Sequence, residues 1–303
     1  MSVFTDFQQK LSASIQGTQL RFDEPMSKHT SFRIGGPVEV MAFPRNAQEL
    51  SALLRTAAEM QVQPAILGAG TNVLAPDAGL SGLCICLKDA LDGMELLEDN
   101  SIRVMAGVTM TRAAVFAANH GLSGMEFAHG IPGTVGGGVY MNAGAYGGEI
   151  CDICESVDVM DMHGNLRTLT SAEMQFSYRH SRLEEEGGIV VSAVFRLIPR
   201  DSDEIKAKMK ELQGKRSASQ PLELPSAGSA FKRPVGGYAA ALIDQAGLKG
   251  FTVGGAAIST KHSGFAVNIG GATAEDVKAL LLQVSDRVYE NSGIRLEPEV
   301  RIW

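Results

Sequence analysis

The sequence predicts a mixed α+β protein with a larger N-terminal part and a smaller C-terminal part. Apolar stripes at helical spacing alternate along the chain with short, β-branched runs that end in glycine turns. Residues 201–220 are charged and then serine-rich, which is typical of an exposed helix that runs into a linker. We place a domain boundary there, and the 303 residues suffice for roughly two domains of about 150 residues.

The N-terminal part contains two stretches with a helical pattern. Asn46 is a suitable cap for the first, because Glu49 follows three residues later. The apolar stripe of this helix consists of Leu50, Leu53, Leu54, Ala57 and Ala58. The second stretch, 111–121, ends at Gly121, a residue type that suits the position after a helix.

The C-terminal part contains two more helical patterns. Residues 238–250 predict a short helix, and Thr273 with Asp276 predicts the capped start of a longer one. The apolar stripe of the longer helix consists of Val277, Leu280, Leu281, Val284 and Val288.

Runs typical of strands lie between the N-terminal helices and before the boundary. Residues 64–76 predict a strand, a glycine turn and a second strand, and residues 82–87 and 101–110 predict one strand each. Residues 156–170 predict a hairpin that turns at His163, Gly164 and Asn165, and the β-branched run 187–199 predicts another strand.

Composition and charge disfavour several classes of protein. A net charge of −7 and a pI near 5.4 argue against nucleic acid or an anionic membrane as the main partner, since either favours a basic face. The first 16 residues lack the basic and apolar regions of a secretory signal, and no apolar run approaches the ~18 residues that span a bilayer. We therefore expect a cytoplasmic protein without membrane insertion.

The four cysteines form two close pairs, Cys84 with Cys86 and Cys151 with Cys154. Such pairs are compatible with a zinc or redox site. Residues 83–89 predict a strand, however, and two residues on one strand face are poorly placed to ligate one metal. We therefore favour free structural thiols and expect no metal.

Residues 129–149, HGIPGTVGGGVYMNAGAYGGE, carry eight glycines among apolar and amide side chains, unlike a flexible linker. A second glycine turn, GAGTNV, spans residues 68–73. Consecutive backbone N–H groups in such turns form anion-binding concavities, and Asn72 and Asn142 add amide groups. The two turns suit a dinucleotide that lies against the backbone, and the alternative is a pair of tight hairpins that bind nothing.

The turn at 68–73 does not carry the dinucleotide fingerprint of the Rossmann fold. That fingerprint needs a third glycine at the sixth position and a helix after it. Val73 occupies the sixth position, and the LAPDAG that follows is not a helical sequence. We therefore reject a Rossmann domain.

Six motifs follow one another along the chain, namely GAGTNVL, GIPGTVGGGVYMNAGAYGGE, YRHSR, PSAGSAFKRP, AISTKHSGFAVN and LEPEVR. In order and spacing they resemble the UDP-N-acetylenolpyruvoylglucosamine reductase family, from about residue 20 to the last residues. KHTSFRIGGP at 28–37 looks like the N-terminal flavin-domain signature of that family. The short span between Arg182 and Ser229 is similar to the shorter of its two classes, which lacks an extra substrate-covering segment.

The resemblance implies an α+β fold with an FAD-binding domain of the vanillyl-alcohol oxidase (PCMH) type in two subdomains, followed by a smaller substrate-binding domain. We expect residues 1–85 and 86–205 to form the two FAD-binding subdomains. Residues 206–303 would form the substrate-binding domain, with a last strand that can return to the FAD domain.

The resemblance also implies that the two glycine segments wrap the pyrophosphate and flavin of FAD. The implied cofactor contacts are Gly68, Gly70, Thr71, Asn72, Gly130, Ile131, Pro132, Gly133, Gly136, Gly137, Asn142, Ala143 and Gly144.

The implied reaction reduces UDP-N-acetylglucosamine enolpyruvate to UDP-N-acetylmuramate for peptidoglycan precursor synthesis. NADPH gives hydride to FAD, the reduced flavin gives hydride to the β-carbon of the enolpyruvyl ether, and the α-carbon takes a proton. Adding hydride pushes negative charge onto the neighbouring carboxylate. That charge requires preorganised positive charge and a correctly placed proton donor.

Three residues match the catalytic residues of the family. Arg179 in YRHSR matches its arginine, which can bind a carboxylate through two parallel N–H bonds. Ser229 matches the serine that protonates carbon, with Ser226 as its rival three residues earlier. Glu299 matches the glutamate that stabilises or protonates the enol form. Glu297 shares its strand face, and only the EVR context separates the two.

The substrate is expected to be a UDP-sugar. Tyr178 is a candidate for the wall of the site, and the candidate clamps for the diphosphate are Lys232, Arg233, Lys261 and His262. Simple solvated side chains are the alternative for the clamps. We expect a monomer or weak oligomer that binds no nucleic acid.

Two other functions fit parts of this pattern. An FAD-dependent alcohol oxidase or dehydrogenase of the same superfamily would keep the flavin, and His129 would be its candidate for a covalent flavin link. A nucleotide-sugar sensor would use the same pockets without turnover. Arg179, Ser229 and Glu299 argue against the sensor, because a pure binding protein has no need of a proton donor.

Overall fold

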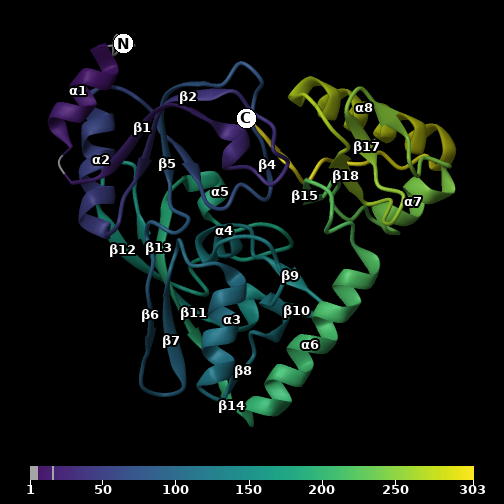
Figure 1. Ribbon diagram of the computed structural model, residues 1–303. Helices are drawn as coiled ribbons and strands as arrows, with labels where there is room; N and C mark the ends of the chain where they lie inside the picture. The colour runs from purple at the N-terminus through teal and green to yellow at the C-terminus, as the bar shows by residue number, and fades with distance from the viewer. Residues whose placement is uncertain (1–5, 16) are drawn as a thin grey trace. The chain divides into compact units, whose positions relative to one another are not determined.

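The structure of the protein, a computed structural model, describes residues 6–15 and 17–303 (Figure 1). The expectation that no secretory signal is present concerns the first 16 residues, of which 1–5 and 16 lie outside the described residues. Across the ranges that are described, no helix is long and apolar enough to cross a membrane.

The chain forms two compact units that interleave along the sequence. Unit 1 consists of the chain up to Asp23 together with residues 39–69 and 81–214. Unit 2 consists of residues 24–38, 70–80 and 215–303. Two segments from the N-terminal half of the chain therefore belong to the same unit as the C-terminal residues.

Unit 1 is built around two sheets. The first has the order β1-β2-β5-β3 and contains β1 (Gln19–Pro25), β2 (Pro37–Phe43), β5 (Leu80–Cys86) and β3 (Ala65–Leu67), with β3 parallel to β5. The second has the order β12-β11-β13-β7-β6 and contains β12 (Leu166–Thr170), β11 (Cys154–Met160), β13 (Ile189–Arg196), β7 (Ser101–Met105) and β6 (Met94–Leu96). All neighbours in the second sheet are antiparallel, so the predicted hairpin at 156–170 is confirmed.

The helices of unit 1 are α1 (Asp6–Ser14), α2 (Ala47–Glu59), α3 (Met110–Asn119), α4 (Val135–Tyr140) and α5 (Leu183–Glu186). Asn46 caps α2 as predicted, because its side chain accepts a hydrogen bond from the Glu49 N–H at 2.8 Å. The predicted stripe of α2 is buried except for Ala58, which is exposed. Short strands and turns complete the unit, namely β8 (Leu122–Ser123), β9 (Gly144–Ala145), β10 (Gly148–Glu149), β14 (Ile198–Pro199), η2 (Glu126–Ala128) and η3 (Ile150–Asp152).

Unit 2 contains a four-stranded antiparallel sheet with the order β15-β18-β17-β16. Its strands are β15 (Ser226–Ser229), β18 (Phe265–Asn268), β17 (Ala256–Ile258) and β16 (Thr252–Val253), and its helices are α7 (Ala239–Gln245) and α8 (Ala274–Ser292). β4 (Val73–Leu74) pairs in parallel with β19 (Arg301–Ile302), and η1 (Met26–Lys28) lies in the first segment of the unit.

The predicted capping of α8 is confirmed. Thr273 and Asp276 exchange side-chain and backbone hydrogen bonds in a capping box, and the whole predicted stripe is buried. Asp77, from the 70–80 segment, accepts hydrogen bonds from the Ala274 N–H at 2.8 and 2.9 Å. A carboxylate at this helix start is favourable, because it satisfies an otherwise unpaired N–H and faces the positive end of the helix dipole.

The core of unit 2 also draws on its two N-terminal segments. Phe32 and Leu74 are buried together with Phe231, Leu280 and other apolar residues of the C-terminal segment. Burial of this kind supplies most of the favourable free energy of folding, so these segments are an integral part of unit 2.

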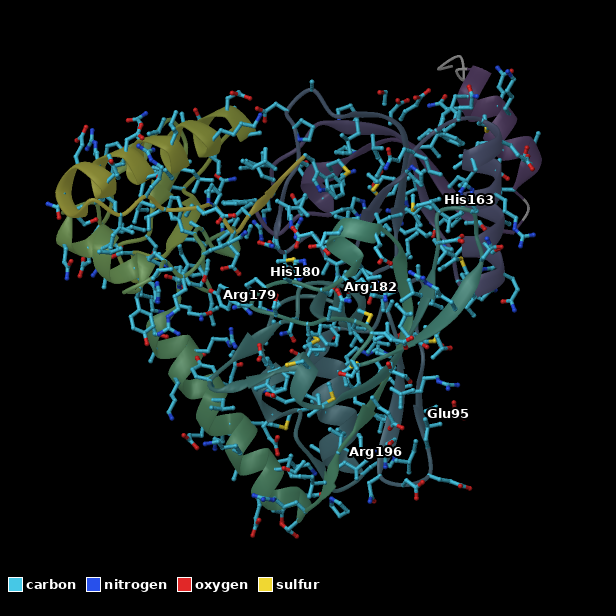
Figure 2. The ribbon with its side chains drawn as sticks, turned by 180° about the vertical axis from the view of Figure 1, so that it is seen from behind. Glu95, His163, Arg179, His180, Arg182 and Arg196 are labelled. Carbon is cyan, nitrogen blue, oxygen red and sulfur yellow. The ribbon has the colours of Figure 1, made fainter. Side chains whose placement is uncertain are left out.

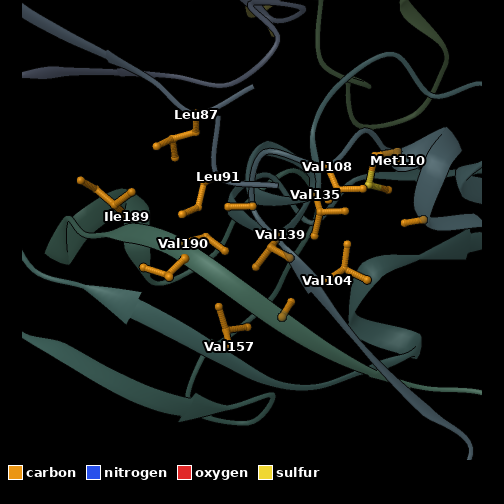
Figure 3. Packing of buried hydrophobic residues seen from close by; sticks show 14 of the residues in the cluster. Leu87, Leu91, Val104, Val108, Met110, Val135, Val139, Val157, Ile189 and Val190 are labelled. Atoms are coloured by element: carbon orange, nitrogen blue, oxygen red, sulfur yellow. The ribbon is translucent and has the colours of Figure 1, made fainter. Parts of the chain in front are cut away.

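One prediction about local structure is wrong, and one glycine-rich segment forms a helix in addition to the predicted turns. The predicted linker at the end of 201–220 is helical, because α6 (Ser202–Ser219) continues through the serine-rich end. The glycine segment 129–149 is not a series of turns alone, because α4 occupies residues 135–140 within it. Its Val135 and Val139 pack into the core beside Val104 and Val108 (Figure 3), and this burial outweighs the poor helix propensity of glycine.

Candidate active site

The glycine segment of unit 1 lies along the loop between β7 and α3. The Val135 N–H donates to the Val108 carbonyl at 2.8 Å, and the Gly136 N–H donates to the Ala106 carbonyl at 2.9 Å. Thr134 caps α4, with its side chain accepting from the Gly137 N–H. The backbone of this segment is therefore fixed by unit 1 itself.

The three consecutive glycines of α4 differ in what surrounds them. A side chain at Gly136 would come within 2.8 Å of the Ala106 Cβ, and one at Gly138 within 2.7 Å of the Met110 Sδ. Close packing within unit 1 accounts for the absence of a side chain at both positions. Gly137, in contrast, is exposed, and the nearest atom to its ideal Cβ is the Thr134 Oγ1 at 3.7 Å, an ordinary contact.

An exposed glycine inside a helix costs about 0.5–1 kcal/mol relative to alanine, and among the described residues no atom comes close enough to exclude a side chain at position 137. Its missing side chain leaves the adjacent face of α4 open to a closely approaching group. This position therefore fits the predicted contact between the segment and FAD.

The turn at 68–72 offers unpaired backbone donors. Gly70 is buried with φ +61°, and a side chain there would come within 2.1 Å of the His29 carbonyl oxygen. The N–H groups of Gly70 and Asn72 donate no hydrogen bond to any residue in the described ranges. Buried N–H groups are almost always paired, so that of the buried Gly70 fits an anionic ligand such as the pyrophosphate of FAD. The N–H of the half-buried Asn72 lies two residues further along the same turn and can add a second donor.

The other predicted cofactor residues are distributed over both units. Unit 1 contains Gly68 and residues 130–144, and unit 2 contains Gly70, Thr71 and Asn72. In unit 1 the Gly130 N–H donates to the Thr111 Oγ1 at 3.1 Å and the Ile131 N–H to the Ala128 carbonyl. Pro132 is exposed, Gly133 accepts from the Met110 N–H, and the Ala143 N–H donates to the Gly138 carbonyl. Contact of these residues with FAD stays a prediction.

Asn142 differs from the expected side-chain ligand. It is buried, and its Nδ2 donates to the Glu149 carboxylate and to the Ser177 carbonyl, both at 3.0 Å. Its Oδ1 accepts from the Cys151 N–H at 3.0 Å. The amide of Asn142 is thus engaged inside unit 1, where it holds the glycine segment against the turn at 177–180, and contact between Asn142 and the cofactor stays a prediction.

Arg179 occupies the turn that Asn142 holds. Its backbone has φ +56°, a strained conformation for a residue with a side chain. Its guanidinium donates to the Gly144 carbonyl from both terminal nitrogens at 3.3 Å and lies 5.5 Å from the centre of the Tyr178 ring. Figure 2 shows Arg179 beside His180 in this turn. The cation is therefore brought to the glycine segment of unit 1.

The turn has a further anchor that sequence reasoning missed. Ser181 is fully buried, and its hydroxyl donates to the Tyr140 carbonyl at the end of α4 at 2.7 Å. Within YRHSR, a serine two residues after the predicted arginine was the only available signal for this contact. Tyr178 itself is about half exposed, at 53%.

Ser229 and Glu299 lie on neighbouring segments of unit 2. The Glu299 N–H donates to the Ala230 carbonyl at 2.9 Å, and the Lys232 N–H donates to the Glu297 carbonyl at 2.8 Å. Residues 229–232 therefore run antiparallel to 297–299. Ser229, at the end of β15, is exposed, and Glu299 is half-buried.

The structure separates Glu299 from Glu297. Glu297 is exposed and forms a short ion pair with Lys232, whereas Glu299 is half-buried. Ser226 and Ser229 also differ, because the Ser226 carbonyl accepts a hydrogen bond from the Ser31 hydroxyl at 2.5 Å and Ser229 is more exposed. These differences favour the Glu299 and Ser229 pair for contact with a ligand.

The predicted diphosphate clamps already have partners in unit 2. Lys232 pairs with Glu297, the Arg233 guanidinium lies 4.1 Å from the centre of the Tyr238 ring, and the Lys261 Nζ donates to the Ser217 carbonyl at 2.8 Å. Their charge is therefore partly compensated before any anion binds.

His262 does not fit the role of a cation. Burial lowers its pKa below the ordinary 6.5, with the nearby Lys249 charge acting in the same direction. Its Nδ1 accepts a hydrogen bond from the Gly264 N–H at 3.1 Å, which favours the neutral ring. Both effects disfavour a charged His262 ring, and contact between His262 and the diphosphate stays a prediction.

The four cysteines are free thiols. Burial raises the pKa of Cys86 to about 11 and that of Cys154 to about 12, and it raises the pKa of Cys84 further. Cys151 is half-buried, and desolvation raises its pKa as well. Thiolates are therefore scarce at neutral pH, so all four fit the structural role that we favoured.

Comparison with known proteins gives consistent matches along the chain. Residues 38–170 match the family described as "FAD binding domain", and residues 220–303 match "UDP-N-acetylenolpyruvoylglucosamine reductase, C-terminal domain". A UDP-N-acetylenolpyruvoylglucosamine reductase of Streptococcus thermophilus is 44% identical over 97% of this chain and 96% of its own length. One of Agathobacter rectalis is 47% identical over 92% of both chains.

A solved structure agrees with these matches. The crystal structure of UDP-N-acetylenolpyruvylglucosamine reductase from Thermus caldophilus is 35% identical and superimposes with a TM-score of 0.79. The match covers 94% of this chain and 98% of that one.

Proposed function

Because the chain belongs to the UDP-N-acetylenolpyruvoylglucosamine reductase family, we propose that it reduces UDP-N-acetylglucosamine enolpyruvate to UDP-N-acetylmuramate with NADPH. The observation that carries the proposal is near full-length identity of 44% to a curated reductase. The candidate residues Arg179, Ser229 and Glu299 supply the chemistry that this reduction requires.

FAD is the cofactor of the proposed reaction. Bound FAD supplies the transfer of hydride from NADPH to the β-carbon of the substrate. The unpaired N–H groups of Gly70 and Asn72 would hold its pyrophosphate, and the open face at Gly137 would admit its rings.

Arg179 would stabilise the negative charge that develops on the substrate carboxylate. A guanidinium is always charged and presents two parallel N–H groups to a carboxylate. The Gly144 carbonyl and the strained turn hold the Arg179 guanidinium in one place before substrate binds. Charge that is already oriented needs little reorganisation during the reaction, which is the main source of its catalytic effect.

Ser229 would donate the proton to the α-carbon, and Glu299 would stabilise or protonate the enol form. A serine hydroxyl is a weak acid, so its proton transfer requires neighbouring groups that stabilise or reprotonate the oxygen. Glu299 is a candidate for that role, because the backbone at 299 is bonded to the residue that follows Ser229.

Further proposals concern the substrate contacts, the location and oligomeric state of the enzyme, and the division of the chain into domains. A UDP-sugar would meet Tyr178, Lys232, Arg233, Lys261 and His262. Its diphosphate would either displace the present partners of the three cations or bind beside them. We propose a cytoplasmic enzyme that is a monomer or weak oligomer, and a division at about residues 85 and 205 into two FAD-binding subdomains and a substrate-binding domain.

A spectrum of the purified protein tests the proposed function. We expect flavin absorption bands that NADPH bleaches and that UDP-N-acetylglucosamine enolpyruvate restores. Protein that stays colourless after reconstitution with FAD would contradict the proposal. Bleached protein that oxygen reoxidises but the enolpyruvyl substrate does not would favour the alcohol oxidase alternative.

A further inference from the structure

The last segment of the chain in unit 2 changes partners at Glu299. Before it, residues 297–299 pair antiparallel with 230–232, through the Lys232 N–H to the Glu297 carbonyl and the Glu299 N–H to the Ala230 carbonyl. After it, β19 pairs in parallel with β4, through the Arg301 N–H to the Asn72 carbonyl at 3.0 Å and the Trp303 N–H to the Leu74 carbonyl at 3.1 Å. Glu299 lies at the junction of the two ladders.

Neither ladder reaches the Glu299 carbonyl through a backbone donor. In the antiparallel ladder the Ala230 N–H would return the hydrogen bond, but it donates to the Gly264 carbonyl at 2.8 Å instead. If the parallel ladder between β4 and β19 continued by one more hydrogen bond, the Asn72 N–H would donate to the Glu299 carbonyl. The Asn72 N–H makes no such bond in the described part of the chain.

The side chain of Asn72 supplies the missing bond. Its Nδ2 donates to the Glu299 carbonyl at 3.1 Å, while its own carbonyl accepts from Arg301. One residue of the glycine turn thus holds the backbone on both sides of Val300, which is buried. The amide replaces a ladder bond at the point where the backbone of residues 70–72 turns away.

We infer that Asn72 is a positioning residue for Glu299, which acts by holding the peptide group from which the candidate acid projects. The inference rests on the proposed function for its catalytic consequence. It assigns one N–H of the Asn72 Nδ2 group to the Glu299 carbonyl, so that only the backbone N–H and the second Nδ2 hydrogen of Asn72 remain for an anionic ligand. The turn that would bind FAD and the segment that carries the acid are then linked through one residue.

Peptide-resolved hydrogen exchange on the FAD-loaded protein tests the structural part. In Asn72→Asp the donor to Glu299 is lost, and we expect the amides of Glu299 and Arg301 to exchange about fivefold faster or more. Asn72→Ala removes the donor without adding a charge and should give the same result. Unchanged exchange of 297–303 in both variants would overturn the inference.

Asn268→Asp is the matched control. The Asn268 Nδ2 donates to the Phe32 carbonyl at 3.0 Å in the same unit, and the Oδ1 that binds Gly270 and Ala272 is kept in the variant. We expect faster exchange near Phe32 but not in 297–303. Loss of protection at 297–303 in this control as well would mean that any weakened amide loosens the segment, which would also overturn the inference.

The two half-reactions test the catalytic part. In the Asn72 variants, reoxidation of the reduced flavin by the enolpyruvyl substrate should slow about tenfold more than reduction by NADPH, because a misplaced acid affects only the second step. In Asn268→Asp the ratio of the reoxidation rate to the reduction rate should equal that of the unsubstituted enzyme. If Asn72 were instead a side-chain ligand of FAD, retention of FAD and both half-reactions would fall together.

The outcomes separate this inference from the proposed function. If the unsubstituted protein is not reoxidised by the enolpyruvyl substrate, the proposed function fails, while the exchange result still decides whether Asn72 holds Glu299.

Discussion

Arg179 in unit 1 and the Ser229 and Glu299 pair in unit 2 are held in place by different means. Arg179 projects from a strained turn and is fixed through its side chain, which bonds to the Gly144 carbonyl. Ser229 and Glu299 lie on segments that are fixed through backbone pairing at Ala230 and, for Glu299, through the Asn72 amide.

Because Arg179 is anchored through its side chain and Ser229 and Glu299 lie on backbone-paired segments, the two units should tolerate substitutions differently. Side-chain anchoring makes the position of the Arg179 charge sensitive to its immediate neighbours, because the guanidinium bonds and the strained backbone act on the same residue. The segments that carry Ser229 and Glu299 are paired through backbone groups. The Ser229 hydroxyl and the Glu299 carboxyl can therefore be removed by substitution while the backbone hydrogen bonds remain. Substitutions in unit 2 should therefore separate chemistry from stability more cleanly than those in unit 1.

The largest expected effect is that of Ser229→Ala. Reduction of the flavin by NADPH should continue, and reoxidation by the enolpyruvyl substrate should slow about 10²- to 10⁴-fold, because the proposed proton donor is lost. Stopped-flow absorbance of the flavin measures both steps.

Ser226→Ala is the control for this prediction. Ser226 lies on the same strand, and its recorded bond to Ser31 uses the backbone carbonyl, which the variant keeps. Both half-reactions should run at the unsubstituted rate. A greater loss in Ser226→Ala than in Ser229→Ala would show that the two serines have been interchanged.

The next effect is that of Arg179→Gly. Reoxidation should slow about 10²- to 10³-fold, because the charge proposed to stabilise the developing enolate is removed. The free energy of unfolding should change by less than about 1 kcal/mol, because relief of the left-handed strain offsets the lost hydrogen bonds. Stopped-flow kinetics and urea unfolding check the two parts.

Gln175→Gly controls for the release of strain. Gln175 is exposed in the same region of unit 1, with φ +48°. This variant should relieve similar strain and leave both half-reactions unchanged. A loss of activity in Gln175→Gly equal to that in Arg179→Gly would contradict a specific role for the Arg179 charge.

The two neighbouring glycines of α4 sharpen the comparison within unit 1. Gly136→Ala should destabilise the apoprotein by about 1–3 kcal/mol, because the new methyl group meets Ala106. Gly137→Ala should stabilise the apoprotein by up to about 1 kcal/mol, because alanine favours a helix and meets no close atom.

Although Gly137→Ala should stabilise the apoprotein, we expect it to weaken the binding of FAD. Gly137→Ala should weaken FAD binding in a fluorescence titration, since its methyl group would occupy the open face of α4. Unweakened FAD binding by a more stable Gly137→Ala apoprotein would show that this face does not contact the cofactor.

The smallest expected effect is a pH dependence in unit 2. Burial lowers the pKa of His262, so below pH 6.5 the unfolded chain binds a proton more readily than the folded protein does. The free energy of unfolding is therefore not reduced by His262 above pH 6.5, and it decreases as the pH falls below 6.5 and the unfolded chain takes up the proton. In His262→Asn, whose Oδ1 can accept from Gly264, the decrease in stability from pH 7.5 to pH 5.5 should be smaller.

Thermal unfolding at the two pH values measures this difference. An equal pH dependence in the variant and the unsubstituted protein would mean that folding does not lower the pKa of His262, and it would strengthen the histidine as a candidate clamp for the diphosphate.

Local signals predicted much of the fold. The caps at Asn46 and at Thr273 with Asp276, the hairpin at 156–170 and the stripe of α8 were all predicted, because each depends on residues within a few positions of one another. The serine-rich end of α6 and the glycine-rich α4 were not predicted. In both, the local preference of the residues opposes the helix, and α4 forms because its valines are buried.

The candidate site also contains features that the sequence predicted and features that it could not predict. Motif order along the chain predicted the candidates Arg179, Ser229 and Glu299, and matching those motifs requires no knowledge of distances. The same reasoning could not separate Glu297 from Glu299 or show that Asn142 donates to the Ser177 carbonyl, since these contacts depend on residues far away in the chain. The burial of His262 likewise depends on the folded unit, although its partner Gly264 is near in the chain.

The sequence by itself determined the family, the α+β class and the candidate residues, because these depend on residue types and on their order. Only the tertiary structure decided that residues 24–38 and 70–80 join unit 2, that the Asn142 amide is already engaged, and that the Asn72 amide donates to the Glu299 carbonyl. Those facts depend on which backbone donors and acceptors remain unpaired after the chain has folded. That pairing is a property of all the strands together and is not encoded in any single motif.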